Sequence, residues 1–258
     1  MSSAAVRADD YDTLASVYDW IVPAEIVTPE GSAAAFLPYL EELAPGARVL
    51  DCAAGTGPVA VGLALRGFDV VATDASAGMV ERTRALAERE GVALDARECR
   101  WEELEAQGFD PFDAVLCVGN SLGHAPGRAA RQAALGAMAA VLRPGGLLVL
   151  TSRNFELMRA TDPGLQTFDR VVERNGRRGV VIYSWWLAED WEDEHGFDVA
   201  VALLGDDDEV RTIGERLSFW PYAYDTLREE LRAAGLEPET STFEAEVDRY
   251  LITARRSA

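Results

Sequence analysis

The stretch that decides the fold is Val49-Leu-Asp-Cys-Ala-Ala-Gly-Thr-Gly57. Its apolar start is typical of a buried strand, and two glycines come after it at the spacing of a tight turn before an apolar helical segment. Because Gly55 and Gly57 lack Cβ atoms, they can adopt positive φ angles and let a ligand lie against the backbone at the helix N-terminus. The glycines also match the dinucleotide fingerprint, which extends to Ala60, and ordinary turn glycines have the same spacing. The stretch alone therefore predicts a strand, a turn and a helix, and leaves the ligand open.

Hydrophobic periodicity extends this pattern along the chain. Further strands are predicted at 48–51, 69–73, 93–98, 112–118 and 146–152, and helices at 9–20, 31–43, 58–66, 77–90 and 128–142. Short apolar strands separated by helices are typical of a parallel sheet that is covered on both faces. The expected fold is therefore α/β, with a doubly wound, mostly parallel sheet of seven strands.

After residue 154 the pattern changes to the period-two alternation of antiparallel strands. The segments 169–174 and 179–186 flank Asn175-Gly176, a dipeptide that favours a two-residue hairpin turn. Strands at 196–204 and 209–219 come next, before a helix at 222–234 and a closing strand at 248–255. An antiparallel β insertion is therefore expected before the last helix.

Composition limits the partners of the protein. A chain of 258 residues with 48% apolar content can bury one sizeable core, and its net charge of −20 would repel a nucleic acid backbone. The apolar runs are far shorter than the roughly 20 residues of a membrane span, and residues 1–5 show no signal-peptide core. We therefore expect a cytoplasmic protein without nucleic acid or membrane partners. All 24 basic residues are arginine, which excludes a lysine nucleophile or base and reflects either codon bias or salt adaptation.

The cysteines and one histidine carry no metal or disulfide signal. Cys52, Cys99 and Cys117 lie in apolar or strand-like contexts without the spacing of metal ligands. They predict reduced, buried thiols, and no metal site is expected. His195 lies among acidic residues in a predicted loop, so we expect its side chain to be solvated.

Two carboxylates end the first two predicted strands of the core. Asp74 ends the second strand, where a carboxylate can accept hydrogen bonds from both hydroxyls of a ribose. Asp51 ends the first strand and suits a cationic or hydrogen-bond-donating ligand better than a pyrophosphate, because like charges repel. Together they favour an adenosine-containing ligand.

Four motifs in order then carry a family resemblance: the stretch 49–57, Asp74-Ala-Ser76, Phe112-Asp-Ala-Val-Leu116 and Leu142-Arg-Pro-Gly-Gly146. Over residues 45–153 the chain resembles the class I S-adenosylmethionine-dependent methyltransferases. Shorter segments resemble the glycine and sarcosine N-methyltransferases: Arg100-Trp101, Val118-Gly-Asn-Ser-Leu-Gly-His124 and Ser152-Arg-Asn154. The resemblance implies S-adenosylmethionine as cofactor and S-adenosylhomocysteine as product.

The resemblance also divides the chain and assigns its cofactor contacts. It implies one methyltransferase domain (1–258), made of an N-terminal helical lid (1–44), a cofactor-binding core (45–154), a β insertion that forms the acceptor site or lid (155–220) and a C-terminal helix with closing strands (221–258). Contacts to the methionine moiety, ribose, adenine and sulfonium are implied for Ala53, Gly55, Gly57, Asp74, Met79, Arg100, Trp101, Val118 and His124, and the lid supplies Tyr11 and Tyr18. The arginine with which such N-methyltransferases bind the donor's carboxylate falls near Pro29, so that contact must be made differently here.

The acceptor site is expected at the end of the strand that precedes Arg153. A buried guanidinium needs an anionic partner, because burying it alone costs several kcal/mol. That partner is either an internal acidic residue or the carboxylate of an acceptor. The resemblance implies the second, with Asn120 as a polar contact and Asn120 and His124 as the catalytic residues. Further predicted acceptor contacts are Tyr183, Trp220 and Tyr222.

Two enzymatic functions remain open from the sequence. The first is methyl transfer to the amine of an amino acid-like small molecule, for which alignment and desolvation matter more than a strong base. The second is methylation of N, C or O in a larger natural-product acceptor, since Phe219 and Trp220 stand where the glycine enzymes tend to have tyrosines. A non-catalytic binding module and a nicotinamide dehydrogenase fit the motifs less well. The sequence leaves the acceptor, the methylated atom and the formation of a homo-oligomer open.

Overall fold

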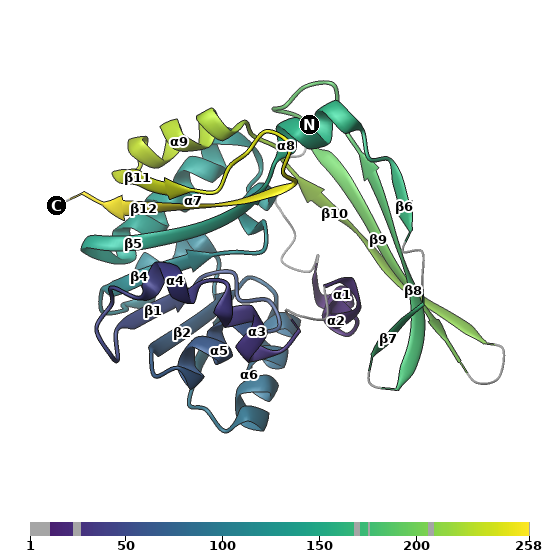
Figure 1. Ribbon diagram of the computed structural model, residues 1–258, viewed down its shortest axis with the longest axis horizontal. Coiled ribbons are helices and arrows are strands. Elements are labelled where there is room, and N and C mark those ends of the chain that lie inside the picture. The colour runs from purple at the N-terminus through teal and green to yellow at the C-terminus, as the bar shows by residue number, and fades with distance from the viewer. Residues whose placement is uncertain (1–10, 23–26, 168–170, 175, 206–208, 258) are drawn as a thin grey trace.

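The computed structural model describes residues 11–22, 27–167, 171–174, 176–205 and 209–257. Its central sheet has seven strands in the order β11-β12-β5-β4-β1-β2-β3 (Figure 1). Their bounds are β1 Arg48–Asp51, β2 Asp69–Asp74, β3 Asp95–Glu98, β4 Phe112–Cys117, β5 Leu142–Arg153, β11 Leu236–Ser241 and β12 Arg249–Arg256. β1 to β5 pair in parallel, and β12 is antiparallel to both β5 and β11. The predicted doubly wound, mostly parallel sheet is confirmed.

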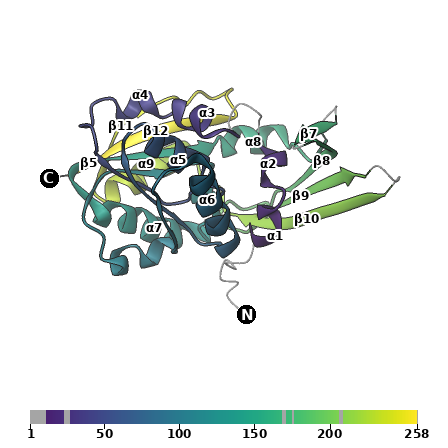
Figure 2. The ribbon, with the colours of Figure 1, turned by 90° about the horizontal axis from the view of Figure 1, so that it is seen from below.

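Helices cover both faces of this sheet, because its strands are apolar on both faces. One face packs against α3 (Pro29–Ala34), α4 (Leu37–Leu40) and α5 (Pro58–Leu65), and α6 (Ala77–Glu90) lies beside α5. The other face packs against α7 (Gly127–Val141) and α9 (Tyr224–Ala233). Figure 2 shows α3 and α4 on one side of the sheet and α7 on the other. Alternation along β1 shows why, since Val49 belongs to the first core and Leu50 to the second.

The N-terminal segment differs from the two continuous helices expected at 9–20 and 31–43. It forms α1 (Asp12–Ala15) and α2 (Tyr18–Ile21), then α3 and α4, and residues 9 and 10 lie outside the described part of the chain. α2 ends before Val22, whose backbone is extended. A residue that precedes a proline favours this conformation because the helical one would clash with the proline ring. Pro38 lies in the first turn of α4, where its missing N–H is tolerated, whereas inside a continuous helix it would remove a hydrogen bond.

The insertion forms a second, antiparallel sheet in the order β10-β9-β8-β6, with β7 also paired to β8. It comes after a short helix, α8 (Phe155–Thr161), and consists of β6 Leu165–Thr167, β7 Val172–Arg174, β8 Arg177–Trp186, β9 His195–Leu204 and β10 Val210–Phe219. The expected hairpin is present, since β7 and β8 pair with Arg174 opposite Arg177, although Asn175 itself lies outside the described residues. α8, β6 and β11 were not predicted individually.

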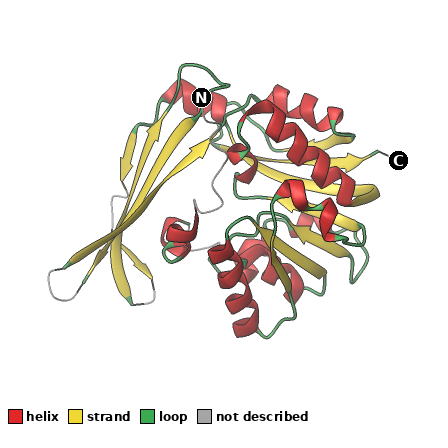
Figure 3. Ribbon diagram, turned by 180° about the vertical axis from the view of Figure 1, so that it is seen from behind, coloured by secondary structure: helices red, strands yellow, loops and turns green. Residues whose placement is uncertain are grey.

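The second sheet projects from the core, and α1 and α2 lie between the two (Figure 3). Their side chains Leu14, Val17 and Trp20 are buried against the strands of the second sheet. Gly179 of β8 is required for this packing, because a Cβ there would lie 2.9 Å from a ring carbon of Trp20. The N-terminal segment therefore packs the insertion against the core, in addition to the direct packing of Phe219 in the main core.

The structure contradicts the prediction for His195 and confirms the prediction for the three cysteines. His195 begins β9, is 1% exposed and stands in strand register opposite Phe219, so the expectation of a solvated side chain was wrong. All three cysteines are free and buried, as predicted. Within the described ranges, no helix is long and apolar enough to cross a membrane, and no group of three or more His, Cys, Asp or Glu side chains is arranged to hold a metal ion.

A buried ion pair joins α7 to α9 and provides a test of this packing. Arg131 donates from Nε and Nη2 to the two carboxylate oxygens of Glu230 at 2.6 and 2.9 Å. Glu230→Gln should lower the free energy of unfolding by about 3–5 kcal/mol, because it leaves the buried guanidinium without its counter-charge. Urea denaturation measures this loss. Glu237→Gln, in the exposed pair with Arg232, is the control and should change stability by less than about 0.5 kcal/mol; equal losses in both variants would contradict a special role for the buried pair.

Candidate active site at the carboxyl ends of the parallel strands

The glycine turn after β1 has the geometry that the sequence predicted. Gly55 and Gly57 have φ angles of +56° and +88°. At Gly57 a Cβ would lie 2.7 Å from Oγ1 of Thr83, so packing also excludes a side chain there. At Gly55 a Cβ would meet nothing within 4 Å, which leaves an open space above the backbone. The turn therefore has one packed side and one side that a ligand can approach.

Asp74 holds the turn from the neighbouring strand. Its Oδ2 accepts a hydrogen bond from the Gly55 N–H at 2.8 Å, and its Oδ1 accepts one from Ser76 N–H at 3.0 Å. A carboxylate has about four acceptor positions, so these bonds leave capacity for hydroxyl groups of a ligand. The residue is half-buried at the end of β2. Its predicted role at a ribose stays a prediction, with the side chain correctly placed for it.

Asp51 is the most unusual group of the site. It is 1% exposed, its Oδ1 lies 3.4 Å from the Ala53 N–H, and its Oδ2 has no hydrogen-bond partner among the described residues. Burial raises the pKa of this carboxyl group from its usual value of 3.8 to about 7, and the nearby Asp74 acts in the same direction. A buried carboxylate oxygen without a donor is costly unless a ligand supplies one. The side chain therefore fits a cationic or hydrogen-bond-donating ligand.

The predicted adenine contacts lie beside the turn but differ in accessibility. Trp101 is half-buried and donates from Nε1 to the carbonyl of Cys52 at 2.8 Å, which fixes its ring next to the glycine turn. The half-buried Arg100 precedes it, and its N–H donates to Glu103. Met79 is only 1% exposed in α6, so its packing is that of a core residue. Val118, the residue predicted to lie beneath the sulfonium, is buried just after β4.

His124 links the N-terminal lid to the second sheet. Its Nδ1 lies 2.7 Å from the carbonyl oxygen of Ser218, which only accepts, so Nδ1 carries the hydrogen. Its Nε2 then accepts from the hydroxyl of Tyr11 at 2.9 Å, and the two rings pack edge to face. Burial lowers the pKa of His124, which keeps the ring neutral. Because both nitrogens are engaged, this geometry favours positioning of the lid over proton transfer.

Tyr18 lies within electrostatic reach of Asp74. Its ring packs against Tyr11 with centroids 6.2 Å apart. Burial raises the pKa of its hydroxyl, and Asp74 adds to the effect. The structure thus brings both predicted lid tyrosines to the strand ends.

The acceptor side begins at Asn120, which comes after β4, and Arg153, which ends β5. Asn120 has a left-handed backbone with φ of 72°, and its Oδ1 accepts the Arg153 N–H at 2.9 Å. The Arg153 guanidinium lies 4.8 Å from the Trp185 ring centroid and donates from Nη1 to Asp248 at 3.2 Å. Nε and Nη2 have no hydrogen-bond acceptor in the described part of the chain. Burial lowers the pKa of Arg153 to about 10, with repulsion from Arg249 as a further cause.

The other predicted acceptor residues differ in burial: Tyr183 is half-buried, whereas Trp220 and Tyr222 are buried. Tyr183 lies near Arg153 and donates to the carbonyl of Ile21 at 2.9 Å, so it joins the second sheet to the lid. Trp220 is buried, and its backbone N–H donates to the Gly123 carbonyl at 2.7 Å. Tyr222 is 3% exposed in the core, with its hydroxyl 2.9 Å from Oγ of Ser152. The burial of Tyr222 argues against the substrate contact that the sequence predicted.

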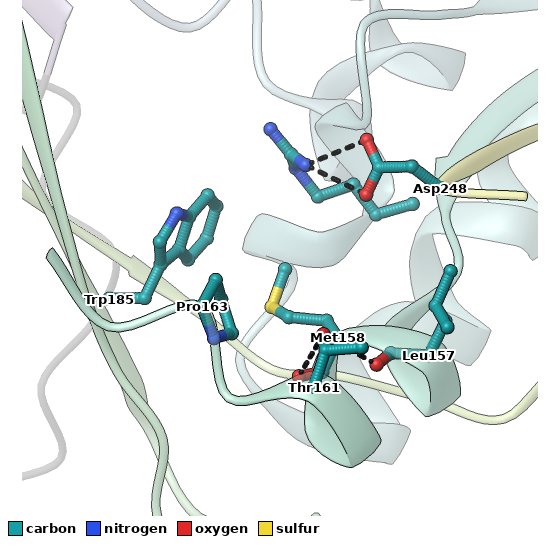
Figure 4. Close-up of a pocket in the computed structure, with 7 residues that line it drawn as sticks. Leu157, Met158, Thr161, Pro163, Trp185 and Asp248 are labelled. Carbon is teal, nitrogen blue, oxygen red and sulfur yellow. Dashed lines mark hydrogen bonds and ion pairs between the residues drawn. The ribbon is translucent and has the colours of Figure 1, made fainter. Parts of the chain in front are cut away.

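A cavity of about 210 Å³ opens beside Arg153. α8 and the residues after it form one wall, and Trp185 and Asp248 line it from other elements (Figure 4). Sequence reasoning missed Asp248 and Arg249 as site residues. The predicted closing strand could have indicated them, because a strand antiparallel to β5 and paired with it begins beside the residue where β5 ends.

Fold and site together define a doubly wound α/β protein with a nucleotide-type ligand site at the carboxyl ends of its strands. Residues 49–146 match the family model described as a methyltransferase domain. The glycine N-methyltransferase of Oryctolagus cuniculus is 31% identical over 215 residues, which cover 72% of this chain and 68% of that protein. The chain therefore belongs to the class I S-adenosylmethionine-dependent methyltransferases.

Other relatives match over a shorter region. The glycine/sarcosine N-methyltransferase of Parasynechococcus marenigrum is 39% identical over 112 residues, 43% of this chain and 40% of that protein. The glycine N-methyltransferase of Rattus norvegicus is 39% identical over 127 residues, 44% of this chain and 43% of that protein. The chain thus spans less than half of the length of these two relatives.

Solved structures extend the likeness of the fold to nearly the whole chain. A methyltransferase from Streptomyces caelestis has a TM-score of 0.77 at 22% identity and covers 97% of this chain and 99% of its own. A sugar N-methyltransferase from Streptoalloteichus has a TM-score of 0.72 at 24% identity and covers 100% of this chain and 96% of its own. The second sheet is therefore part of a fold that other methyltransferases share.

The raised pKa of Asp51 has a consequence for stability. Because the native group binds its proton more tightly than the unfolded one, its contribution to stability falls as pH rises from about 4 to about 7. Asp51→Asn should therefore stabilise the protein at about pH 8, by up to about 4 kcal/mol, and the gain should shrink as pH is lowered toward 4.

Urea unfolding across this pH range measures the difference. Asp69→Asn makes the same substitution at the exposed start of β2 and is the matched control. A variant at position 51 that is less stable than the wild type at pH 8 would show that the carboxylate has an internal partner.

Proposed function

We propose that the protein transfers a methyl group from S-adenosylmethionine to a small molecule, the amine of an amino acid-like acceptor. One observation carries the proposal: charge is separated along a single edge of the sheet. Asp74 and Asp51 lie at the ends of β2 and β1, and Arg153 lies at the end of β5. Asn120 and His124 come after β4, which lies between β1 and β5. A cationic donor suits one side of this edge and an anionic acceptor suits the other.

The residues on the donor side fit S-adenosylmethionine. Its charged methionine moiety would lie over Gly55, where the backbone is open, and its positive groups would provide what the unpartnered Asp51 oxygen lacks. Asp74 would accept hydrogen bonds from the ribose, and Trp101 would border the adenine. Tyr11 and Tyr18 would cover the donor from the lid.

The residues on the acceptor side fit a carboxylate. The Nε and Nη2 groups of Arg153 offer two parallel N–H donors, which is the arrangement that a carboxylate binds in bidentate fashion. Asn120 fixes the backbone of Arg153 at the strand end. An amine attached to the same carbon as the carboxylate would then face the β4 end, which lies next to β1 and its donor turn.

The chemistry asked of the protein is modest. The sulfonium supplies an activated methyl group, so a neutral amine can displace it when the two are aligned and water is excluded. The neutral, fully engaged imidazole of His124 suits a role in alignment, because it ties Tyr11 to Ser218 of β10. Tyr183 adds a second tie, from β8 to the end of α2.

A second candidate is methylation of a larger natural-product acceptor without a carboxylate. The Arg153–Asp248 ion pair favours it, because an internal counter-charge satisfies the guanidinium without a ligand. In that case Arg153 would be structural and the aromatic residues of the second sheet would contribute most of the acceptor binding.

Asp74→Asn tests the donor site. The amide keeps one oxygen for the Gly55 N–H but removes the charge, so affinity for S-adenosylmethionine should fall by about 2–4 kcal/mol while the fold persists. Isothermal calorimetry measures the affinity, and Asp69→Asn on the same strand serves as control. Wild-type donor affinity in Asp74→Asn would place the ribose elsewhere.

Arg153→Ala separates the two candidate functions. If the acceptor carries a carboxylate, kcat/KM for the acceptor should fall by an amount equivalent to about 2–5 kcal/mol of transition-state stabilisation, with donor affinity unchanged. Arg153→Lys should restore little of this loss, because a point charge does not reproduce the guanidinium fork. Steady-state kinetics measure the loss. Arg143→Ala, at the exposed start of β5, is the matched control. Near-normal turnover in Arg153→Ala would favour the acceptor without a carboxylate.

A further inference from the structure

We propose that the acceptor is an α-amino acid with a bulky apolar side chain, which enters the cavity beside Arg153, and that Arg249 completes the anion site for its carboxylate. This inference rests on the proposed function and narrows its substrate class. It makes glycine a poor acceptor.

The first step is the pairing of β5 with β12. Arg249 lies directly opposite Arg153 in this antiparallel pair, so both side chains leave the sheet on the same face. Like charges in such positions repel each other, and nothing in the packing of the core requires this pair. Two arginines at one strand end therefore indicate a shared anionic partner.

The internal partner balances only half of this charge. Oδ2 of Asp248 lies 3.2 Å from Arg153 and 3.6 Å from Arg249. Tyr18 lies within electrostatic reach of Arg249, and Tyr183 lies within reach of both guanidinium groups. Burial raises the pKa of both phenols, so they add no negative charge. Among the described residues, one carboxylate between two guanidinium groups leaves a single positive charge, with the Arg153 side chain 19% exposed and that of Arg249 57% exposed. One further carboxylate, from a ligand, restores the balance.

The second step is the cavity. Leu157, Met158 and Pro163 line it with apolar atoms, and Trp185 closes it with the ring that also lies against the Arg153 guanidinium. Figure 4 shows Met158, Pro163 and Trp185 facing a common space, with Asp248 across from them. An acceptor held by its carboxylate at Arg153 therefore has, within reach of its side chain, a cavity that combines these apolar walls with the polar groups of Arg153, Thr161 and Asp248.

The volume of the cavity favours an acceptor whose side chain is larger than that of glycine. A volume of about 210 Å³ is roughly that of seven water molecules in the liquid, at about 30 Å³ each. A leucine or phenylalanine side chain can displace that water, whereas glycine leaves the apolar walls wet. Since a single methylene in a hydrophobic pocket changes kcat/KM by about 10-fold or more, a four-carbon side chain should raise it by well over 10-fold.

The experiment compares matched acceptors in the presence of S-adenosylmethionine, with methylated products read by mass spectrometry. Leucine and phenylalanine are tested against glycine, and each against the amine that lacks its carboxylate, 3-methylbutylamine and phenethylamine. We expect kcat/KM at least about 10-fold higher for leucine and phenylalanine than for glycine, and at least about 10-fold lower for the two amines.

Two variants test the two halves of the site. Leu157→Trp fills the cavity from its half-buried wall and should collapse the preference for leucine over glycine. Arg249→Gln should raise KM for amino acids about 10-fold or more without changing donor affinity. Arg89→Gln, on the exposed end of α6, is the matched control and should leave all acceptor kinetics unchanged. Thermal melting and donor calorimetry verify folding, and Thr161→Trp replaces Leu157→Trp where that variant does not fold.

The outcomes separate this inference from the proposed function. Equal or better turnover of glycine would overturn the cavity as the side-chain site while leaving the proposed function in place. Equal turnover of the amines, or wild-type KM values in Arg249→Gln, would overturn the two-arginine site. Failure to methylate any of these acceptors by an enzyme that binds the donor would overturn the amino acid acceptor, and this inference with it.

Discussion

The parallel pairing of β4 with β1 and β5 is the constraint on which the rest of the site depends. Asp51 stands opposite Leu116 of β4, so β1 and β4 end at nearly the same level, whereas Cys117 stands opposite Leu150 and β5 continues beyond it to Arg153. Parallel strands bring all their following loops to one edge, and this is where ligands of doubly wound sheets bind. Residues far apart in sequence, such as Asp51 and Arg153, therefore share a site without touching each other. Any change of register would alter the distance between the glycine turn after β1 and Arg153.

The N-terminal segment adds a second constraint, because it is packed against both sheets. Trp20 is buried against β8 through the space that Gly179 leaves, and Arg82 of α6 pairs with Asp19 of α2 at 3.1 Å. Tyr11 reaches His124, whose other nitrogen is bound to β10. The N-terminal segment, the core and the second sheet are thus joined at the same point. A displacement of the N-terminal segment would be transmitted to β10 through the Tyr11–His124–Ser218 hydrogen bonds.

Local patterns in the sequence predicted most of the core. Apolar runs of period two and helices of period 3.6 located its strands and helices, and Gly55, Gly57 and Asp74 lie where their motif places them. Sequence patterns did not predict the features that depend on tertiary contacts. His195 has acidic neighbours in the chain, yet strand pairing buries it against Phe219. Asp248 and Arg249 precede an ordinary apolar strand, and only the antiparallel closure of the sheet brings them to Arg153. Tyr222 lay in a plausible aromatic cluster, but it packs below Arg131 in the core.

The burial of Asp51 shows how such a site trades stability for binding. A carboxylate with an unpartnered buried oxygen is unfavourable in the free protein, and the neighbouring Asp74 makes its ionised form more costly. No arginine is paired with Asp51 in the described residues, although the chain has 24 of them. An internal arginine would remove the cost, but it would also occupy the position of a cationic ligand. Leaving the carboxylate unpaired therefore lowers stability and keeps its oxygen open to a ligand. Nε and Nη2 of Arg153 likewise have no hydrogen-bond acceptor in the described ranges.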